Sequence, residues 1–371
     1  MDFELSEDQV MLRDGLRALL RGSCDLDNVR ASAYEGDGSD PGLWEELASA
    51  GWPGLTVPEE HGGAGLGPEE LMVVAMEAGA CPLFLPLVTT LLAARAVAAS
   101  PAPAREELLA SLASGARTAT LALSGSPDEW NREQPAAVAT RSADGWVLNG
   151  RHDFVAFGPR ADLCLMEARL PAGGPGLFVV PTDAAGLTWE DLGSMDPTVR
   201  RYRANLDGAE LPASAALYGD GAADAAVEQA TDELRFALAA ESVGACGRMV
   251  QMTADYAKDR EQFGRPIGSY QAVKVRVAQM ASAFERMTAA VYYAALMVDG
   301  DAAERTVAVR MAKGATAVPG TFVATQAIHV HGAIGYTWEH DLHFFMKRVK
   351  TNELLFGDGN ASNRRIADAV L

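Results

Sequence analysis

Apolar residues follow a helical period at both ends of the chain and a shorter, strand-like period in its middle. Ser6 and Gln9 have the spacing of a capping box and precede a run of residues with one apolar helical face. In the middle of the chain, short apolar runs are separated by Gly, Asp and Pro, which is typical of strands and turns. The pattern predicts an α+β protein with helical, β and helical regions at 1–116, 117–222 and 223–371.

Two positions predict local interruptions of these patterns. Asn149-Gly150 is the strongest turn signal of the β region, so we expect a hairpin between the run Trp146–Leu148 and the strand that follows. In the third region, a long helical pattern contains Pro319-Gly320. Proline removes a helical hydrogen bond, so we expect a kink or a break there.

Composition and charge narrow the classes of function. The chain has 371 residues, of which 49% are hydrophobic, enough for sizeable cores. Its 50 acidic and 31 basic residues give a formal charge of −19, which argues against a nucleic-acid or anionic-membrane surface. An anionic ligand must therefore be held by dedicated local positive charges.

The termini and the cysteines favour a cytoplasmic protein. The N-terminus is acidic and lacks the pattern of a signal peptide, and no run of about 18 uncharged apolar residues predicts a membrane span. The four cysteines stand far apart without a CxxC pair, so we expect reduced, buried thiols. These are Cys24, Cys81, Cys164 and Cys246.

The segment Asp259–Gln271 combines fixed positive charge with a glycine turn between two long helical patterns. Arg260 and Arg265 flank Phe263 in it. A guanidinium fork can bind two phosphate oxygens at once, and each charge-assisted bond contributes about 1.5–3 kcal/mol when water is excluded. The segment therefore predicts a phosphate-binding elbow between two helices.

A second stretch rich in glycine and histidine, Gln326–His340, lies at a helix-to-loop transition. His329 and His331 would point about 200° apart on a helix, which disfavours a shared metal ion, and we expect no metal site. His340 and His343 lie three residues apart beside Glu339, and we expect them to be solvated on a surface loop.

Three motifs in register, together with the helix–β–helix order, resemble the acyl-CoA dehydrogenase family of flavoproteins over nearly the whole chain. The first motif is Gly51-Trp-Pro-Gly-Leu-Thr-Val-Pro-Glu-Glu-His-Gly-Gly. The others are Arg260-Glu-Gln-Phe-Gly-Arg-Pro-Ile with Gln271, and His329-Val-His-Gly-Ala-Ile-Gly-Tyr-Thr-Trp-Glu-His. The resemblance implies an N-terminal helical domain, a β-barrel-like middle domain and a C-terminal four-helix bundle.

The resemblance also implies that the elbow binds the FAD of a neighbouring subunit. By matching motif positions, Arg260 contacts the pyrophosphate, Phe263 packs near the adenosine end, and Gln271 bonds across the interface. His329 stands where many relatives carry a glutamine that contacts the cofactor, and Gly332 lets the backbone come close. Gln262 and Val330 complete the expected FAD-binding set.

The implied reaction is α,β-dehydrogenation of an acyl thioester. A carboxylate removes the α-proton as general base, and the β-hydrogen leaves as hydride to the flavin. The implied partners are an acyl thioester of coenzyme A or of a carrier protein, a second dehydrogenase subunit that is identical or paralogous, and an electron-accepting flavoprotein.

The chain departs from the family at the position of the catalytic general base. Gap-free counting puts Phe356 where relatives carry a glutamate, whereas a two-residue shift puts Asp358 there. Some relatives carry the base on the helix before the elbow, where this chain has Leu234, with Glu233 and Glu241 nearby. Asp358, Glu241, Glu233 and no base at all remain open, and Asp358 is the favoured single residue.

The β region departs as well. The segment Leu123–Trp130 replaces the family's substrate and flavin loop, and in Phe154–Gly158 the residue Ala156 replaces a threonine that reaches the flavin edge. Intact elbow residues beside altered flavin-edge residues favour the partner subunit of a heteromeric enzyme. A homo-oligomer with Asp358 as base is the close second, and a flavin-poor scaffolding subunit is the alternative.

Overall fold

The computed structural model describes residues 4–23, 25–36, 38–124, 137–219 and 223–370. The chain forms two compact units, each assembled from segments that are distant in sequence. Unit 1 comprises Met1–Val29, Pro68–Leu83 and Arg235–Leu371, and unit 2 comprises Arg30–Gly67 and Phe84–Leu234.

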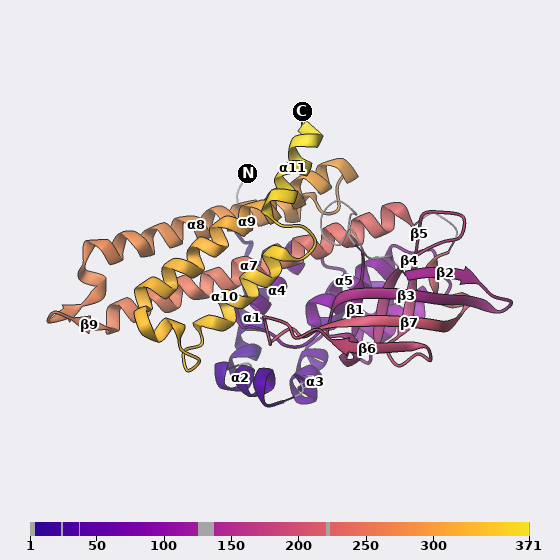
Figure 1. Cartoon of the computed structure of the whole chain (residues 1–371), viewed down its shortest axis with the longest axis horizontal. Coiled ribbons are helices and arrows are strands. Elements are labelled where there is room, and N and C mark those ends of the chain that lie inside the picture. Colours follow the sequence, from indigo (N-terminus) through magenta and orange to yellow (C-terminus); the bar gives the residue numbers. More distant parts are fainter. Residues whose placement is uncertain (1–3, 24, 37, 125–136, 220–222, 371) are drawn as a thin grey trace. The chain divides into compact units, whose positions relative to one another are not determined.

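Unit 1 is helical. Figure 1 shows α7, α8, α9 and α10 side by side, with a small hairpin beyond the ends of α7 and α8. Its helices are α1 (Glu7–Ser23), α4 (Pro68–Ala80), most of α7 (Asp224–Asp259), α8 (Gln271–Met297), α9 (Ala302–His331), α10 (Leu342–Leu354) and α11 (Gly359–Val370), while α2 (Leu26–Tyr34) spans the boundary with unit 2.

The predicted capping box opens α1. The Ser6 amide donates to Gln9 Oε1 at 3.1 Å, and the Gln9 amide donates to Ser6 Oγ at 3.2 Å. Two amide groups of the helix N-terminus that lack a helical partner are thereby satisfied.

The predicted kink or break at Pro319-Gly320 is not a break, because helix α9 continues through both residues. Packing against α8, α10 and α11 on several sides offsets the one hydrogen bond that proline removes. The adjacent Gly320 permits the close approach of α10, because a Cβ there would lie 2.8 Å from Val349 Cγ1.

Two glycines let α4 and α7 cross with their backbones in contact. A Cβ on Gly79 would lie 1.9 Å from the carbonyl oxygen of Glu241, and a Cβ on Gly244 would lie 1.8 Å from that of Met76. No real side chain tolerates these distances, so glycine is required on both helices.

Unit 2 contains a sheet and short helices. Among the described residues the sheet has eight strands in the order β6-β7-β3-β2-β4-β5-β8, with β1 paired parallel to β4. The strands are β1 (Ala119–Ala122), β2 (Ala137–Arg141), β3 (Gly145–Ala156), β4 (Leu163–Arg169), β5 (Pro175–Pro181), β6 (Leu187–Asp191), β7 (Arg201–Pro212) and β8 (Ala216–Tyr218). The helices of this unit are α3 (Pro41–Ser49), η1 (Trp52–Gly54), η2 (Glu59–His61), α5 (Leu87–Ala98), α6 (Arg105–Ala113), η3 (Gly158–Arg160) and η4 (Ala213–Ala215).

The predicted hairpin at Asn149-Gly150 is wrong, because β3 runs through both residues. The β2–β3 turn lies earlier, where Arg141 pairs with Trp146. Gly150, at φ +119°, lies at a register shift against β7, and Asn149 Oδ1 accepts the amide of Gly208 at 2.8 Å. The turn-forming pair therefore makes a bulge inside a long strand.

The sheet encloses an apolar core that includes Trp146 and Phe178, whose rings meet edge to face at 5.1 Å. Among the described residues no helix is long and apolar enough to cross a membrane. Cys164 and Cys246 are buried free thiols, and burial raises the pKa of both. Cys81, however, is disulfide-bonded, which corrects the expectation of a reduced thiol, and Cys24 lies outside the described residues.

Candidate cofactor and active site

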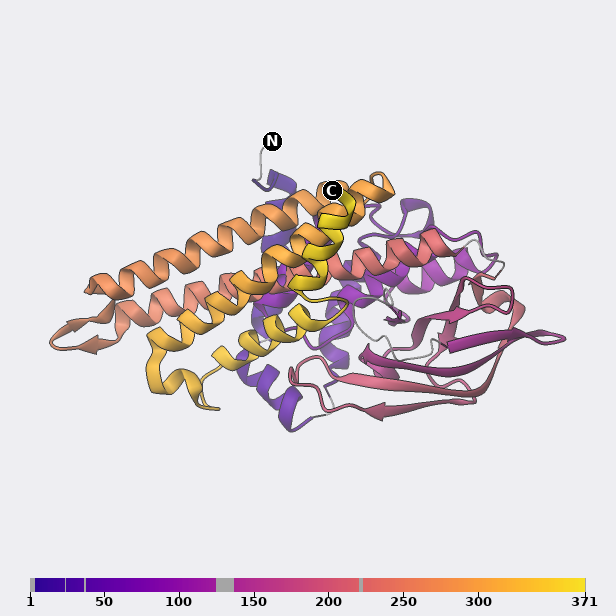
Figure 2. The same ribbon diagram turned by 45° about the horizontal axis from the view of Figure 1, so that its top comes forward.

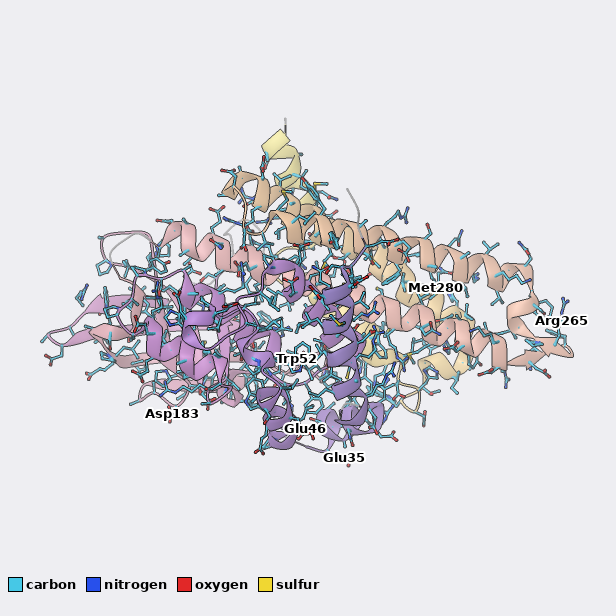
Figure 3. The ribbon with its side chains drawn as sticks, turned by 180° about the vertical axis from the view of Figure 1, so that it is seen from behind. Glu35, Glu46, Trp52, Asp183, Arg265 and Met280 are labelled. Atoms are coloured by element: carbon cyan, nitrogen blue, oxygen red, sulfur yellow. The ribbon has the colours of Figure 1, made fainter. Side chains whose placement is uncertain are left out.

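The elbow is a short hairpin that connects α7 to α8. Strands β9 (Glu261–Gln262) and β10 (Arg265–Pro266) pair, and the Ile267 amide donates to the Arg260 carbonyl at 2.8 Å. The short helix η5 (Ile267–Ser269) then leads into α8. Figure 3 shows Arg265 at this end of the helix pair. The structure thus brings Arg260, Gln262 and Phe263 together in one turn, with Gln271 at the first residue of α8.

Phe263 is presented to the outside at the tip of the elbow. Its side chain is 93% exposed, and its backbone has a φ of +54°, a region that non-glycine residues rarely occupy. Tyr270 braces the turn, because its hydroxyl donates to the Gln262 carbonyl at 3.0 Å and the Arg265 guanidinium lies 4.1 Å from its ring. The elbow is therefore braced by contacts within the chain itself.

The glycine-rich stretch forms the turn from α9 to α10. His329 and Val330 lie in the last turn of α9, with His329 exposed. Gly332 has φ +66° and ψ −138°, a conformation open essentially to glycine alone, and starts η6 (Gly332–Tyr336). The predicted close approach of backbone at Gly332 is therefore sterically available.

Tyr256 links the elbow to this turn. Its ring stacks on His331 at 4.4 Å, and its hydroxyl lies 3.4 Å from the His331 carbonyl oxygen. Its own carbonyl accepts the Arg260 amide at 2.8 Å. The two predicted cofactor motifs thus share one support, which the sequence did not reveal because Tyr256 and His331 lie 75 residues apart.

The histidines of this turn differ from expectation. His343 is buried and His340 half-buried, so the expected solvated surface loop is wrong. His340 meets His331 ring to ring at 4.7 Å, and His343 packs on Phe344 at 4.2 Å. Within the part of the chain that is described, no three metal-ligating side chains are grouped.

The turn that follows α10 is held by buried cations. Arg235 Nε donates to the Phe356 carbonyl at 3.0 Å, with both groups buried. Phe356 has φ +55° and is 7% exposed, and Gly357 has φ +99°. Lys313 donates to the Asn352 and Glu353 carbonyls at the end of α10. Burial, with the charge of Arg235 next, lowers the pKa of Lys313 to about 7.

Asp358 caps the last helix. Its Oδ1 accepts the Ala361 amide at 2.8 Å, and its carbonyl accepts the Ser362 amide at 3.0 Å. This is the geometry of a helix N-cap, which aspartate is among the best residues to provide. The carboxylate that the shifted count favours as a base therefore has a structural hydrogen bond.

The other two carboxylates are also engaged. Glu241 Oε2 lies 3.5 Å from the fully buried guanidinium of Arg348 and 3.1 Å from Asn352 Nδ2. In unit 2, Glu233 accepts two hydrogen bonds from Arg95, at 2.9 and 3.0 Å. Neither carboxylate is a free proton acceptor.

The end of β3 is closed by its own side chains. Ala156, Phe157 and Val199 form a small buried cluster, and Phe157 has a left-handed backbone with φ +63°. The Phe157 amide donates to the Arg200 carbonyl at 3.0 Å, and Thr120 donates to the Ala156 carbonyl at 2.6 Å. This segment is the predicted flavin edge, and Ala156 offers only a methyl group where a hydroxyl donor is expected, with the Phe157 ring beside it. Residues 125–136 of the neighbouring predicted loop lie outside the described residues.

The sequence and the fold match known proteins over nearly their whole length. Residues 6–116 match the N-terminal domain model of acyl-CoA dehydrogenases, and residues 221–371 match the C-terminal domain model. Acyl-CoA dehydrogenase IpdE2 of Mycobacterium tuberculosis is 30% identical, with 98% of each chain covered. The chain belongs to the acyl-CoA dehydrogenase family.

Two solved members of the family are named for pairs of proteins. A variant of the Tcur3481-Tcur3483 steroid acyl-CoA dehydrogenase has a TM-score of 0.87 and 31% identity, with 98% of each chain covered. The ChsE4-ChsE5 complex from Mycobacterium tuberculosis has a TM-score of 0.90 and 28% identity, with 99% of this chain and 98% of that chain covered. The family reaction, FAD-dependent α,β-dehydrogenation of an acyl-CoA, is that of this chain, alone or as one subunit of a heteromer.

The residues of the chain fit FAD at the elbow and the α9–α10 turn, but not at the end of β3. The elbow offers an exposed guanidinium and aromatic ring, and Gly332 admits a close backbone approach. At the end of β3, the buried Phe157 and the missing threonine hydroxyl do not fit a flavin ring.

Proposed function

We propose that the chain is the partner subunit of a heteromeric acyl-CoA dehydrogenase, which lends its elbow to an FAD held mainly by a paralogous subunit. The carrying observation is Phe356, which by gap-free counting falls at the family's base position and whose carbonyl is bound by buried Arg235. A phenyl ring accepts no proton, so the α-proton of the substrate must be removed by a carboxylate of the paralogue.

The remaining carboxylates support this division of labour. Asp358 caps α11, and Glu241 pairs with buried Arg348. A general base must be free to accept a proton from the substrate, and using either carboxylate would break a hydrogen bond that stabilises unit 1. The flavin-edge segment supports the proposal as well, because Phe157 closes it from within.

The chain's contribution is to bind and orient the cofactor. Arg260 would bind the pyrophosphate, Phe263 would pack at the adenosine end, and Gln271 would bond across the interface. The α9–α10 turn would add contacts through its backbone at Gly332. When bound, FAD supplies the acceptor for the hydride that leaves the β-carbon. The cofactor-binding set is Arg260, Gln262, Phe263, Gln271, His329, Val330 and Gly332.

The wider setting follows from the same proposal. The substrate is an acyl-CoA, a separate flavoprotein accepts the electrons, and the complex works in the cytoplasm. The two relatives named for protein pairs support a heteromer, since both cover nearly the whole chain at 28% and 31% identity.

Flavin absorbance of the purified protein tests the proposal. We expect no flavin band from the chain produced alone, and a band together with turnover after co-production with the paralogous subunit. A flavin band and turnover from the chain alone would establish the homo-oligomer instead. Absence of flavin under both conditions would leave the scaffolding role.

Arg260→Ala in the co-produced complex tests the elbow. Loss of one charge-assisted phosphate contact, about 1.5–3 kcal/mol, predicts roughly 10- to 100-fold weaker FAD retention. Lys258→Ala is the matched control, because Lys258 is an exposed cation two residues away that pairs with Asp255. Equal FAD retention in the two variants, measured by equilibrium dialysis, would remove Arg260 from the cofactor site.

A further inference from the structure

Two histidine rings close the base of the α9–α10 turn. His331 ends α9 and His340 lies two residues before α10, and their ring centroids are 4.7 Å apart. On its other side, His331 stacks on Tyr256 of α7. The views in Figures 1 and 2 both place this turn at the end of the bundle where α7 approaches the elbow. Gly332 and all of η6 lie between His331 and His340 in the sequence.

The hydrogen bonds indicate whether Nδ1 of each ring carries a proton. His331 Nδ1 lies 2.8 Å from the Ala327 carbonyl, which can only accept, so this nitrogen carries a proton. His340 Nδ1 lies 3.2 Å from the Leu342 amide, which can only donate, so this nitrogen carries none. The neutral ring of His340 therefore accepts the amide of the first residue of α10.

Protonation of His340 has three costs at this site. It removes the acceptor of the Leu342 amide, puts a positive charge at the positive end of the α10 dipole, and brings that charge within 4.7 Å of His331. Burial lowers the pKa of both rings from their ordinary value of 6.5. The hydrogen bond to Ala327 raises the pKa of His331 in part, and the charge of His340 lowers it further. Asp341 raises the pKa of His340 in part.

One neighbouring carboxylate, that of Asp341, partly offsets the effect of burial on the pKa of His340. Tyr256 faces His331 from α7 through its ring. From α10, His343 Nδ1 lies 2.8 Å from the His340 carbonyl, and Lys347 sits 4.2 Å over the ring of Trp338 in the turn. Asp341 is thus the main neighbouring carboxylate that acts on His340.

We propose that His340, in its neutral form, is a positioning residue that holds the Gly332–Tyr336 turn in its cofactor-binding conformation. The proposal rests on the assignment of this turn to the cofactor. Because the folded state disfavours the charged imidazoles, the stabilisation is complete above pH 6.5 and is lost as the pH falls from there through the lowered pKa values. Acid therefore opens the turn and weakens FAD binding, by up to about tenfold per pH unit for one proton.

His340→Asn tests the role of the ring nitrogen. Asparagine Oδ1 can accept the Leu342 amide but does not titrate, and asparagine side chains commonly bond the backbone two residues on. In the co-produced holoenzyme we expect His340→Asn to retain FAD at about pH 7.5 like the wild type, and to retain severalfold more than the wild type at about pH 5.5. The matched control is His61→Asn, which removes a histidine of unit 2 and should leave the acid release of FAD unchanged.

Amide hydrogen exchange of the chain alone separates this proposal from the function assigned above. At the lower pH we expect residues 332–342 to exchange faster in the wild type than in His340→Asn, and at the higher pH equally fast. Comparing the wild type with His340→Asn at the same pH removes the effect of the intrinsic pH dependence of amide exchange. Equal protection at both pH values overturns the positioning role, even if FAD behaves as proposed. Differential protection without FAD binding supports the role of His340 and overturns the assignment of the turn to the cofactor.

Discussion

Two turns of unit 1 each contain a phenylalanine with an unusual positive φ, but one ring is exposed and the other is buried. Phe263 in the elbow has φ +54° and is 93% exposed, whereas Phe356 after α10 has φ +55° and is 7% exposed. Left-handed phenylalanine costs about 1–2 kcal/mol in either place. In the elbow this backbone turns a ring outward, and in the α10–α11 turn it packs a ring inside, at the position that gap-free counting assigns to the base of relatives. A similar backbone can thus serve binding or closure, and burial distinguishes the two.

Truncating each ring gives the largest expected contrast between the two turns. Phe356→Ala removes a buried side chain and should lower the free energy of unfolding by about 3–5 kcal/mol. Phe263→Ala should change it by no more than about 0.5 kcal/mol, because its ring contacts little within the chain. Urea unfolding of both variants measures the contrast. A similar loss in both would mean that the elbow ring is part of the core in solution.

The next largest effect on stability is expected from loss of the hydrogen bond between Arg235 and the Phe356 carbonyl, which holds the buried α10–α11 turn. Arg235→Met keeps most of the side-chain volume but leaves the Phe356 carbonyl without its charged donor. We expect a loss of about 1.5–3 kcal/mol in the free energy of unfolding. FAD retention by the co-produced complex should be unchanged, because the elbow is untouched. Loss of FAD without loss of stability would show that the α10–α11 turn also contributes to cofactor binding, and would contradict the distinction between the two turns.

The smallest effects are expected at Asp358, and they distinguish a cap from a base. Asp358→Ala should cost about 0.5–2 kcal/mol of stability, whereas Asp358→Asn preserves a capping oxygen and should cost little. Turnover of the co-produced complex should survive both substitutions. Abolished turnover with retained flavin in Asp358→Asn would identify Asp358 as the base and favour the homo-oligomer.

The fold could be predicted from sequence wherever the signal is local. The Ser6–Gln9 capping box needs only four residues, and the change from helical to strand spacing is visible in the pattern itself. The Asn149-Gly150 pair led to a wrong prediction because a residue with positive φ can form a bulge as well as a turn. Here pairing with β7 on both sides of the pair makes it a bulge. Pro319 does not break α9, because packing on several sides outweighs one lost hydrogen bond.

The candidate site could be predicted in part for the same reason. Arg260 and Phe263 belong to one short motif, and the structure places them in one hairpin. The contact of His340 with His331 depends on how the turn between them closes, so a local pattern suggested solvated side chains. The roles of Arg235 and Lys313 were hidden because their partners are backbone carbonyls at least 39 residues away, and carbonyls leave no signature in sequence.

The glycine crossing of α4 and α7 limits how this chain can diverge. Gly79 and Gly244 each face a backbone carbonyl of the other helix at a distance that forbids a methyl group. Any replacement must come with an outward shift of a whole helix, and α7 also carries Arg235 and leads to the elbow. The two positions should therefore be fixed together across descendants of this chain, while the surrounding helical surface drifts freely.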